Sequence, residues 1–340
     1  MNKVLPLFEE DFVLTLFRQD VLPLYPAFSD ISRVDIRPYK KLIWETTYHV
    51  VIGFDVYFTD PSGRETKIPI VCSAHSDEPR RNVFDVLNYL WEKKIPDQGI
   101  DLPRPLFFSQ HFNGTFYRAL SGENLLHYIK RRDQANVERI VIAAAGLLAK
   151  LHALPVDPEA DFNPDNARIA TVIPGVPMII KEIRTRYQDK YYRDLEKIYA
   201  YFISQEDKLR ARRPVWSLIH GDAHPENIIA TGEDRIGLID FTDFCLADPI
   251  RDVAAFAQQL EYKIINKLDD LDWAKQMRDL FVEEYLAASR LVRDKDFEER
   301  FRLYYDWTAI RTSTFWFLKF GHNEERAAAL LSKVKADLGF

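Results

Sequence analysis

The sequence feature that most constrains the fold is a change in residue pattern near residue 121. Before it, residues 31–76 contain runs rich in Val, Ile, Tyr and Thr (DISRVDIRPY, TYHVVIGFDVYF and KIPIVCSAH). Such runs are typical of strands, and the segment TDPSGRET between the last two has the Pro and Gly of a hairpin turn. The sequence therefore predicts a small antiparallel sheet early in the chain.

Apolar residues also recur at helical spacing, both before and after these strand-like runs. This spacing predicts a leading helix over 8–20 and another that is capped by Asp77, has Pro79 in its first turn and runs through 82–94. Two further strand-like runs follow at 102–110 and 113–120. Beyond residue 121 the predicted helices cover 123–132, 136–154, a charged segment around 179–210 and a long remainder after the last strand. We therefore predict an α+β protein with two lobes, a small antiparallel-sheet lobe at residues 1–120 and a mainly helical lobe at 121–340.

Composition excludes several classes of protein. The 46 Lys and Arg residues against 52 Asp and Glu give a net charge of -6, which argues against non-specific nucleic-acid binding. Cys72 and Cys245 lie in apolar surroundings, so we expect free thiols, no disulfide framework and a reducing, cytoplasmic location. No apolar run of roughly 18 residues occurs, and no membrane span is expected. Oligomeric state cannot be predicted from this sequence.

Polar residues with a recognisable chemistry lie at the ends of short apolar runs in the second lobe. The stretch HGDAHPEN places Asp222 in a loop and Asn227 at the start of an apolar run, and LIDF places Asp240 at the end of the next run. A tight turn at GEDR joins those two runs, so we expect Asn227 and Asp240 to lie close together and to form a magnesium-binding pair. A carboxylate base beside such a pair is what phosphoryl transfer from a metal-bound nucleotide requires.

Two other interpretations of these residues are possible. Single Asp and His residues in loops are usually turn or cap residues, and we expect His220 and His224 to order the loop. Alternatively, His220, Asp222 and His224 form an H-x-D-x-H string that, with Asp240, could bind zinc in a hydrolase. That interpretation gives Asn227 and the sheet-rich first lobe no role.

The whole string HGDAHPENII…GLIDFTDFCLADPIRDVA resembles the aminoglycoside phosphotransferase and choline kinase family, small-molecule kinases with a protein-kinase-like fold. The resemblance implies a bilobal fold and ATP- and magnesium-dependent transfer of phosphate to a small-molecule hydroxyl. It implies Asp222 as the catalytic base and Asn227 with Asp240 as magnesium ligands. Asp248 and Asp252 match the trailing D-P-x-x-D, where we expect a loop-ordering residue and a buried brace. The likeness is strong over about 145–260 and only architectural over 31–125.

The first lobe departs from the family pattern. Members usually carry a Lys on the third strand that contacts the nucleotide phosphates, and a Glu on the next helix that pairs with it. Here the strand IPIVCSA has no Lys, and the helix offers only Asn82, Val83 and Asp85. Lys67, or Lys40 or Lys41 in RPYKKLIWE, could reach the phosphates instead.

The turn before Trp44 has no G-x-G-x-x-G, so the sequence shows no phosphate-binding loop there. We expect the adenine to contact backbone groups in the segment that crosses between the lobes, at Arg118, Ala119 and Leu120. This expectation comes from the layout and the resemblance.

The identity of the acceptor is open. Amino sugar antibiotics, choline-like alcohols, homoserine-like amino acids, sugars and methylthioribose-like sugars all fit the motif. An aromatic stripe between Tyr304 and Phe317 could surround an ammonium group, although packing in the lobe core is the favoured interpretation. A kinase-like binding module without transfer activity is the main alternative function, because the Lys–Glu pair is missing.

Overall fold

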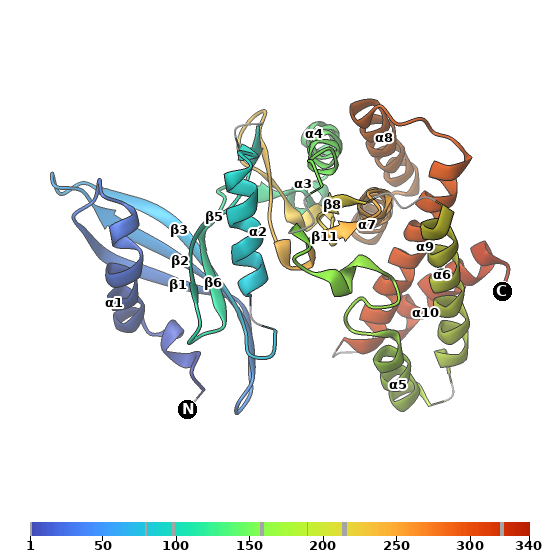
Figure 1. The fold of residues 1–340 in the computed structure, drawn as a ribbon, viewed down its shortest axis with the longest axis horizontal. Coiled ribbons are helices and arrows are strands. Elements are labelled where there is room, and N and C mark those ends of the chain that lie inside the picture. Colours follow the sequence, from blue (N-terminus) through green and yellow to red (C-terminus); the bar gives the residue numbers. More distant parts are fainter. Residues whose placement is uncertain are drawn as a thin grey trace. The chain divides into compact units, whose positions relative to one another are not determined.

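The structure is a computed structural model that describes residues 2–78, 80–96, 99–156, 160–188, 190–212, 216–319 and 323–340. The chain forms two compact units (Figure 1). The first unit contains Met1–Glu123 and Ile229–Thr242, and the second contains Asn124–Ile228 and Asp243–Phe340.

The first unit is built on a five-stranded sheet of order β1-β2-β3-β6-β5, in which every neighbouring pair is antiparallel. Its strands are β1 (Asp30–Ile43), β2 (Tyr48–Thr59), β3 (Glu65–His75), β5 (Arg104–Ser109) and β6 (Gly114–Arg118). The antiparallel sheet predicted from the β-branched and aromatic runs is confirmed.

The two faces of this sheet carry different side chains because successive residues of a strand point to opposite sides. The even-numbered residues 50–58 of β2 and 68–74 of β3 are buried in one core. Helix α1 (Glu10–Asp20) packs on this face, where the Phe17 ring meets the Phe54 ring edge-on at 5.1 Å. The odd-numbered residues, including His49 and His75, consequently line the opposite face.

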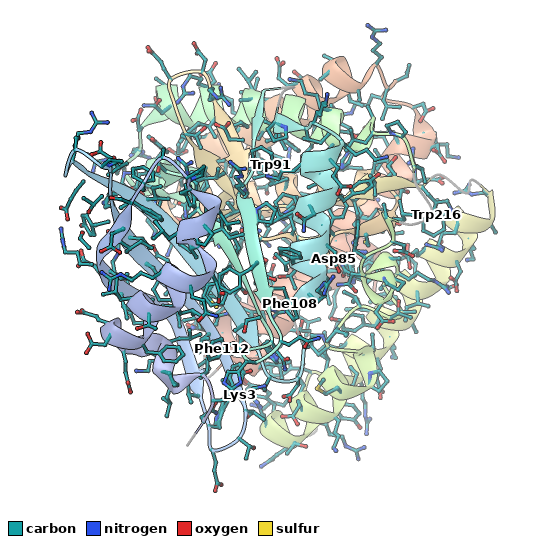
Figure 2. The ribbon with its side chains drawn as sticks, turned by 60° about the vertical axis from the view of Figure 1, so that its left-hand side comes forward. Lys3, Asp85, Trp91, Phe108, Phe112 and Trp216 are labelled. Carbon is teal, nitrogen blue, oxygen red and sulfur yellow. The ribbon has the colours of Figure 1, made fainter. Side chains whose placement is uncertain are left out.

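Helix α2 (Arg81–Glu92) lies beside β5 (Figure 2). The Trp91 indole N–H donates to the Pro103 carbonyl at 2.9 Å, and the Arg81 guanidinium lies 5.6 Å from the centre of the Phe108 ring. These contacts hold the helix against the edge of the sheet.

A second sheet explains why residues 229–242 belong to the first unit. Its order is β4-β10-β9-β7, with strands β4 (Ile100–Asp101), β7 (Glu123–Asn124), β9 (Ile228–Ala230) and β10 (Ile236–Leu238). The β9–β10 hairpin therefore pairs with strands from the first part of the chain. This differs from the predicted boundary between residues 120 and 121, which assigned the hairpin to the second lobe.

The second unit is mainly helical, as predicted, and contains one short antiparallel pair, β8 (Ser217–Ile219) and β11 (Cys245–Ala247). Its longer helices are α3 (Leu125–Lys130), α4 (Gln134–His152), α5 (Val176–Tyr187), α6 (Tyr192–Arg212), α7 (Ile250–Leu268), α8 (Leu271–Ser289), α9 (Lys295–Leu318) and α10 (Glu324–Leu338).

The single charged helix predicted around 179–210 is wrong, because α5 and α6 are separate helices. Gln188 and Tyr191, between them, have φ angles of 56° and 66°, in the left-handed region that interrupts a right-handed helix. Cys72 and Cys245 are free and buried, as expected. Among the described residues, none of the helices combines the length and the apolar character needed to cross a bilayer.

Candidate active site

A buried carboxylate holds the loop that follows β8. Asp252, in the first turn of α7, is fully buried and accepts hydrogen bonds from the His220 N–H at 2.7 Å and the Gly221 N–H at 2.9 Å. The His152 ring at the end of α4 places Nε2 3.2 Å from the same carboxylate. The predicted role of Asp252 as a brace is confirmed. Asp248, two residues before α7, accepts from the Ile250 N–H at 2.9 Å and also binds Arg300, as expected of a loop-ordering residue.

Gly221 is required by the path of this loop. Its φ is 83°, and a β-carbon at this position would lie 2.1 Å from the Asp243 carbonyl oxygen and 2.5 Å from Asn166 Nδ2. Only a residue without a side chain permits this approach. The tight backbone turn presents Asp222 at the end of the loop.

The groups around the Asp222 carboxylate favour its ionised form. Its Oδ2 lies 3.5 Å from His224 Nε2, and 43% of its side chain is exposed. Burial raises the pKa of the Asp222 carboxyl, but the positive charge and hydrogen bond of His224, with smaller contributions from Arg311 and His220, outweigh it and hold the pKa well below its ordinary value. Water still reaches the side chain, so burial disfavours the charged form only partly and the neighbouring positive groups decide the shift. The Asp222 carboxylate is therefore ionised at neutral pH.

His224 is fixed on both sides of its ring. The Glu226 N–H donates to Nδ1 at 3.2 Å, which leaves Nε2 directed at Asp222, and Glu226 is in turn bound by Lys263 at 2.5 Å. Burial lowers the pKa of His224, but the charge of Asp222 more than compensates and the pKa is raised. The expected loop-ordering role is present, and the structure adds a contact with Asp222 that sequence reasoning missed.

Asn227 has the donor chemistry of a magnesium ligand. It is 5% exposed, and its Nδ2 donates to the Asp222 carbonyl oxygen at 3.0 Å. With the nitrogen engaged, Oδ1 is the atom left for a cation, and amide oxygen is a ligand that hard cations accept. Asn227 directly precedes β9, and Asp240 follows two residues after the end of β10.

Asp240 occupies an uncommon backbone conformation with a φ of 64°, in the left-handed region that non-glycine residues rarely adopt outside functional or turn positions. Its exposed carboxylate accepts from the Thr242 hydroxyl through Oδ1 at 2.8 Å, which leaves Oδ2 for a cation. Asn82 of α2 donates to the Thr242 carbonyl at 2.9 Å. Helix α2 lacks the family's Glu, and the Asn82 side chain in its first turn instead anchors the segment after Asp240. Taken separately, the amide oxygen of Asn227 in the second unit and the carboxylate of Asp240 in the first have the chemistry that magnesium prefers, and their pairing stays a prediction.

The predicted nucleotide-binding residues of the crossing segment follow β6 directly. Arg118 is exposed, and the Ala119 N–H donates to the Pro69 carbonyl at 2.9 Å, so that group is already engaged. Leu120 lies over Gly237, where a β-carbon would be 2.2 Å from Leu120 Cδ1. The expected contact of Arg118, Ala119 and Leu120 with an adenine base stays a prediction.

The three candidate lysines occupy different places in the first unit. Lys67, near the start of β3, has its Nζ 3.4 Å from Asp55, which also binds Arg37. Lys41 lies over the Phe8 ring at 4.4 Å, on the α1 side of the sheet. Lys40 pairs with Val51 in register, and its Nζ is 3.4 Å from His49 Nε2 on the opposite face.

Comparison with known proteins identifies the family. A model of the phosphotransferase enzyme family matches residues 53–301. The chain belongs to this family. A search of curated proteins found no match to the sequence.

Solved structures of other kinases share the fold at low sequence identity. An ethanolamine kinase from Plasmodium vivax is 16% identical, with a TM-score of 0.54 over 88% of this chain and 81% of that one. A choline kinase, LicA, from Streptococcus pneumoniae is 13% identical, with a TM-score of 0.53 over 96% and 99%. A spectinomycin phosphotransferase in complex with ADP and spectinomycin is 14% identical, with a TM-score of 0.52 over 96% and 94%. The predicted α+β, protein-kinase-like fold is confirmed.

Two further residues of this phosphotransferase support the loop that carries Asp222 and were missed in the sequence. Asn166 donates through Nδ2 to the Asp243 carbonyl at 2.7 Å, and Arg251 donates to Asn166 Oδ1 at 2.9 Å. Arg251 is 1% exposed and stacks over the Trp307 ring at 4.7 Å. For Arg251, the sequence signal is its position next to Asp252 in the motif. Asn166 has no such signal, because it lies far away in the chain.

Most of the aromatic stripe of α9 packs in the core of this phosphotransferase. Tyr304, Trp307 and Phe317 are buried in one hydrophobic cluster, while Tyr305 and Trp316 are partly buried against it. Trp316 donates through Nε1 to the Tyr262 hydroxyl at 2.7 Å. The packing interpretation of the stripe is confirmed.

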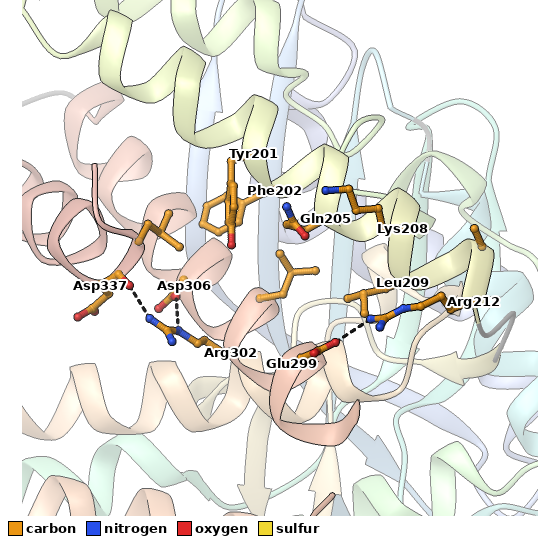
Figure 3. Close-up of a pocket in the computed structure, with 13 residues that line it drawn as sticks. Tyr201, Phe202, Gln205, Lys208, Leu209, Arg212, Glu299, Arg302, Asp306 and Asp337 are labelled. Carbon is orange, nitrogen blue, oxygen red and sulfur yellow. Dashed lines mark hydrogen bonds and ion pairs between the residues drawn. The ribbon is translucent and has the colours of Figure 1, made fainter. Parts of the chain in front are cut away.

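A cavity of about 840 Å³ lies among α6, α9 and α10 (Figure 3). Its lining includes the ion pairs Arg212–Glu299 and Arg302–Asp306 but none of the candidate site residues. Within the described residues, no group of three or more His, Cys, Asp or Glu side chains is arranged to hold a metal ion, so the geometry does not favour the zinc hydrolase alternative.

Proposed function

We propose that this phosphotransferase transfers the γ-phosphoryl group of ATP, with Mg²⁺, to a hydroxyl group of a small molecule. The observation that carries the proposal is the placement of Asp222. Its loop is tied to buried Asp252, its carboxylate faces His224, and its backbone carbonyl is bound by Asn227. A fixed, ionised carboxylate beside a magnesium ligand suits the activation of an acceptor hydroxyl.

Asp222 orients the acceptor hydroxyl and takes its proton as the acceptor oxygen bonds to the γ-phosphorus, while the bond from that phosphorus to the β–γ bridging oxygen breaks and ADP leaves. Because its pKa is low, orientation contributes more than basicity to this step. Asn227 through Oδ1 and Asp240 through its carboxylate would hold magnesium, which supplies charge screening for the phosphates when bound. The hydrogen bond from Asn227 to the Asp222 carbonyl keeps the metal ligand and the base in a fixed relation within the loop.

The first unit would bind the nucleotide and the second would bind the acceptor. The Ala119 carbonyl and the Leu120 N–H supply the acceptor and donor that an adenine edge needs, with Arg118 alongside. The acceptor is a small molecule rather than a nucleic acid or a membrane surface. The similar structures are named for ethanolamine, choline and spectinomycin, all hydroxyl-bearing compounds. The two free, buried thiols suit a cytoplasmic location.

A binding module without transfer activity is the second candidate, because β3 has no lysine at the position that contacts phosphate in the family. Such a module has no physical need for the costly left-handed backbone at Asp240 or for a carboxylate poised at Asp222. A panel of hydroxyl-bearing metabolites scored for ADP release separates the two candidates.

Two substitutions test the assigned roles. We expect Asp222→Asn to lower kcat about 10²- to 10⁴-fold with little change in ATP affinity, since only the proton acceptor is lost. Asp240→Asn should abolish the magnesium-dependent part of ATP binding, measured by thermal shift with and without Mg²⁺. Asp234→Asn, in the exposed β9–β10 turn, is the matched control. Turnover at the wild-type rate by the Asp222→Asn protein would exclude Asp222 as the base.

A further inference from the structure

Four basic side chains gather in the first unit where β2 begins and β3 ends. Lys40 comes from β1, His49 from β2, His75 from β3 and Arg80 from the residue before α2. Lys40 Nζ lies 3.4 Å from His49 Nε2, and the rings of His49 and His75 are 4.6 Å apart. The register explains the grouping, because His49 pairs directly with His75 and Lys40 pairs with Val51.

Arg80 is the most enclosed member of this cluster. It is 6% exposed, and its backbone is fixed by the Thr115 hydroxyl, which donates to its carbonyl at 2.5 Å, and by its own N–H, which donates to the Asn113 carbonyl at 3.2 Å. Its guanidinium reaches Glu78 at 3.4 Å. The His75 N–H donates to the same Asn113 carbonyl at 3.4 Å, which places Arg80 beside the end of β3. Burial, together with the charge of Arg80, lowers the pKa of Lys40, of His49 and of His75.

Holding these groups together is unfavourable in the absence of an anion. Burial first, and then the charges of Lys40, Arg80 and His75, lower the pKa of His49 to about 3. The acidic groups within range are Asp77 and Glu78 beside His75 and Asp240 beside Lys40. Asp240 has its own proposed role at the metal, which leaves the positive charge of Lys40 for a ligand, with that of Arg80 shared with Glu78. A bound anion would offset the mutual repulsion of the cluster.

Space for such a ligand adjoins the cluster. A cavity of about 580 Å³ is bordered by His49, His75 and the Trp44–Thr47 turn that joins β1 to β2. Ser73, two residues before His75, points to the same face of β3, where it offers only a hydroxyl. Around this position the basic groups are His75 at the end of β3, Lys40 and His49 from the neighbouring strands, and Arg80 before α2.

We propose that Lys40, His49, His75 and Arg80 bind the polyphosphate of the nucleotide in place of the missing strand lysine. Lys40 and Arg80 supply positive charge, while the two imidazoles supply ring N–H donors. Lys67 is excluded from this role because it binds Asp55 at the other end of β3. The inference rests on the proposed function, since it assumes that a nucleotide is the ligand.

The test compares affinities for ATP and for adenosine, measured by isothermal titration calorimetry on the full-length protein with Mg²⁺. Lys40→Met should weaken ATP binding about tenfold or more, and His49→Gln about threefold to tenfold, because charged hydrogen bonds to phosphate are lost. Adenosine affinity should not change in either variant. Both side chains are exposed or half-buried, so the substitutions should not prevent folding.

Lys41→Met is the matched control, because Lys41 is the next residue but lies over Phe8 on the other face of the sheet. It should bind ATP as the wild type does. The inference is overturned if Lys40→Met and His49→Gln both bind ATP within twofold of the wild type, or if Lys41→Met loses as much affinity as Lys40→Met. A wild-type protein that binds neither ATP nor adenosine would instead overturn the proposed function, and the inference with it.

Discussion

The position of the Asp222 carboxylate depends on one neighbouring ring. His224 is held by the Glu226 N–H on one side and meets Asp222 on the other. We expect His224→Ala to lower kcat about 10- to 100-fold, because the carboxylate gains rotational freedom and loses its positive partner. ATP affinity should stay within threefold, since the ring contacts no predicted nucleotide-binding residue. Steady-state kinetics and calorimetry measure the two effects separately.

His111→Ala provides the reference for this prediction, because His111 is exposed and its ring lies 4.7 Å from the Phe112 ring, in the first unit. The His111→Ala substitution should leave kcat and ATP affinity unchanged. A His224→Ala protein with a wild-type kcat would show that the loop alone orients Asp222.

At the residue scale the sequence indicates which groups could carry chemistry but only part of what holds them. Asp222, Asn227 and Asp240 stand in one motif, at the ends of apolar runs, and their roles stay predictions that rest on the family resemblance. Asp252 was expected as a brace, but most of its partners were not. The supporting contacts join residues far apart in the chain, such as His152 with Asp252 and Asn166 with Arg251. No local pattern marks an Asn or a His for such a contact, because the partner is determined only by the packing of the helices.

At the scale of the element, the loop after β8 is the most constrained segment of the second unit. We expect Gly221→Ala to destabilise the protein by roughly 2–4 kcal/mol, because the left-handed φ is unfavourable and the new methyl group would collide with the Asp243 carbonyl. Gly146→Ala, in the middle of α4, is the matched control. A β-carbon there meets nothing within 4 Å, so the change should stabilise the protein by about 0.5–1 kcal/mol. Urea denaturation measures the free energy of unfolding of both variants. An equal effect of the two substitutions would contradict the requirement for glycine at position 221.

Long elements could be predicted from the sequence and short ones could not. The strands β1, β2 and β3 have enough alternating residues to define a face, and α4 has several turns of apolar spacing. Strands such as β4 and β7 span only two residues each, too few for any periodicity. The break between α5 and α6 has neither Gly nor Pro, because Gln188 and Tyr191 adopt the left-handed conformation instead.

At the scale of the whole molecule, the sequence predicted two lobes but not the discontinuous path of the chain between them. Residues 229–242 return to the first unit because β10 pairs in parallel with β4. That pairing joins residues more than a hundred positions apart, and a change of composition along the chain cannot reveal it. The consequence is that Asn227 and Asp240, expected as one metal-binding pair, belong to different units.

The stability of the whole molecule should respond to Asp306, a buried carboxylate of α9 that lines the cavity in Figure 3. Burial and the charge of Asp337 raise the pKa of Asp306 to about 6, against the opposing charge of Arg302. The folded state therefore holds the Asp306 proton more tightly than the unfolded chain does. The stability that the protonated carboxyl contributes is lost as pH rises from about 4 to about 6.

We expect Asp306→Asn to raise the free energy of unfolding at pH 7.5 by about 1–3 kcal/mol and to have little effect at pH 4.5. Glu299→Gln, a half-exposed lining residue paired with Arg212, should change it by less than about 1 kcal/mol at pH 7.5. Destabilisation by Asp306→Asn at pH 7.5 would show instead that the ion pair with Arg302 outweighs the cost of burying the charge.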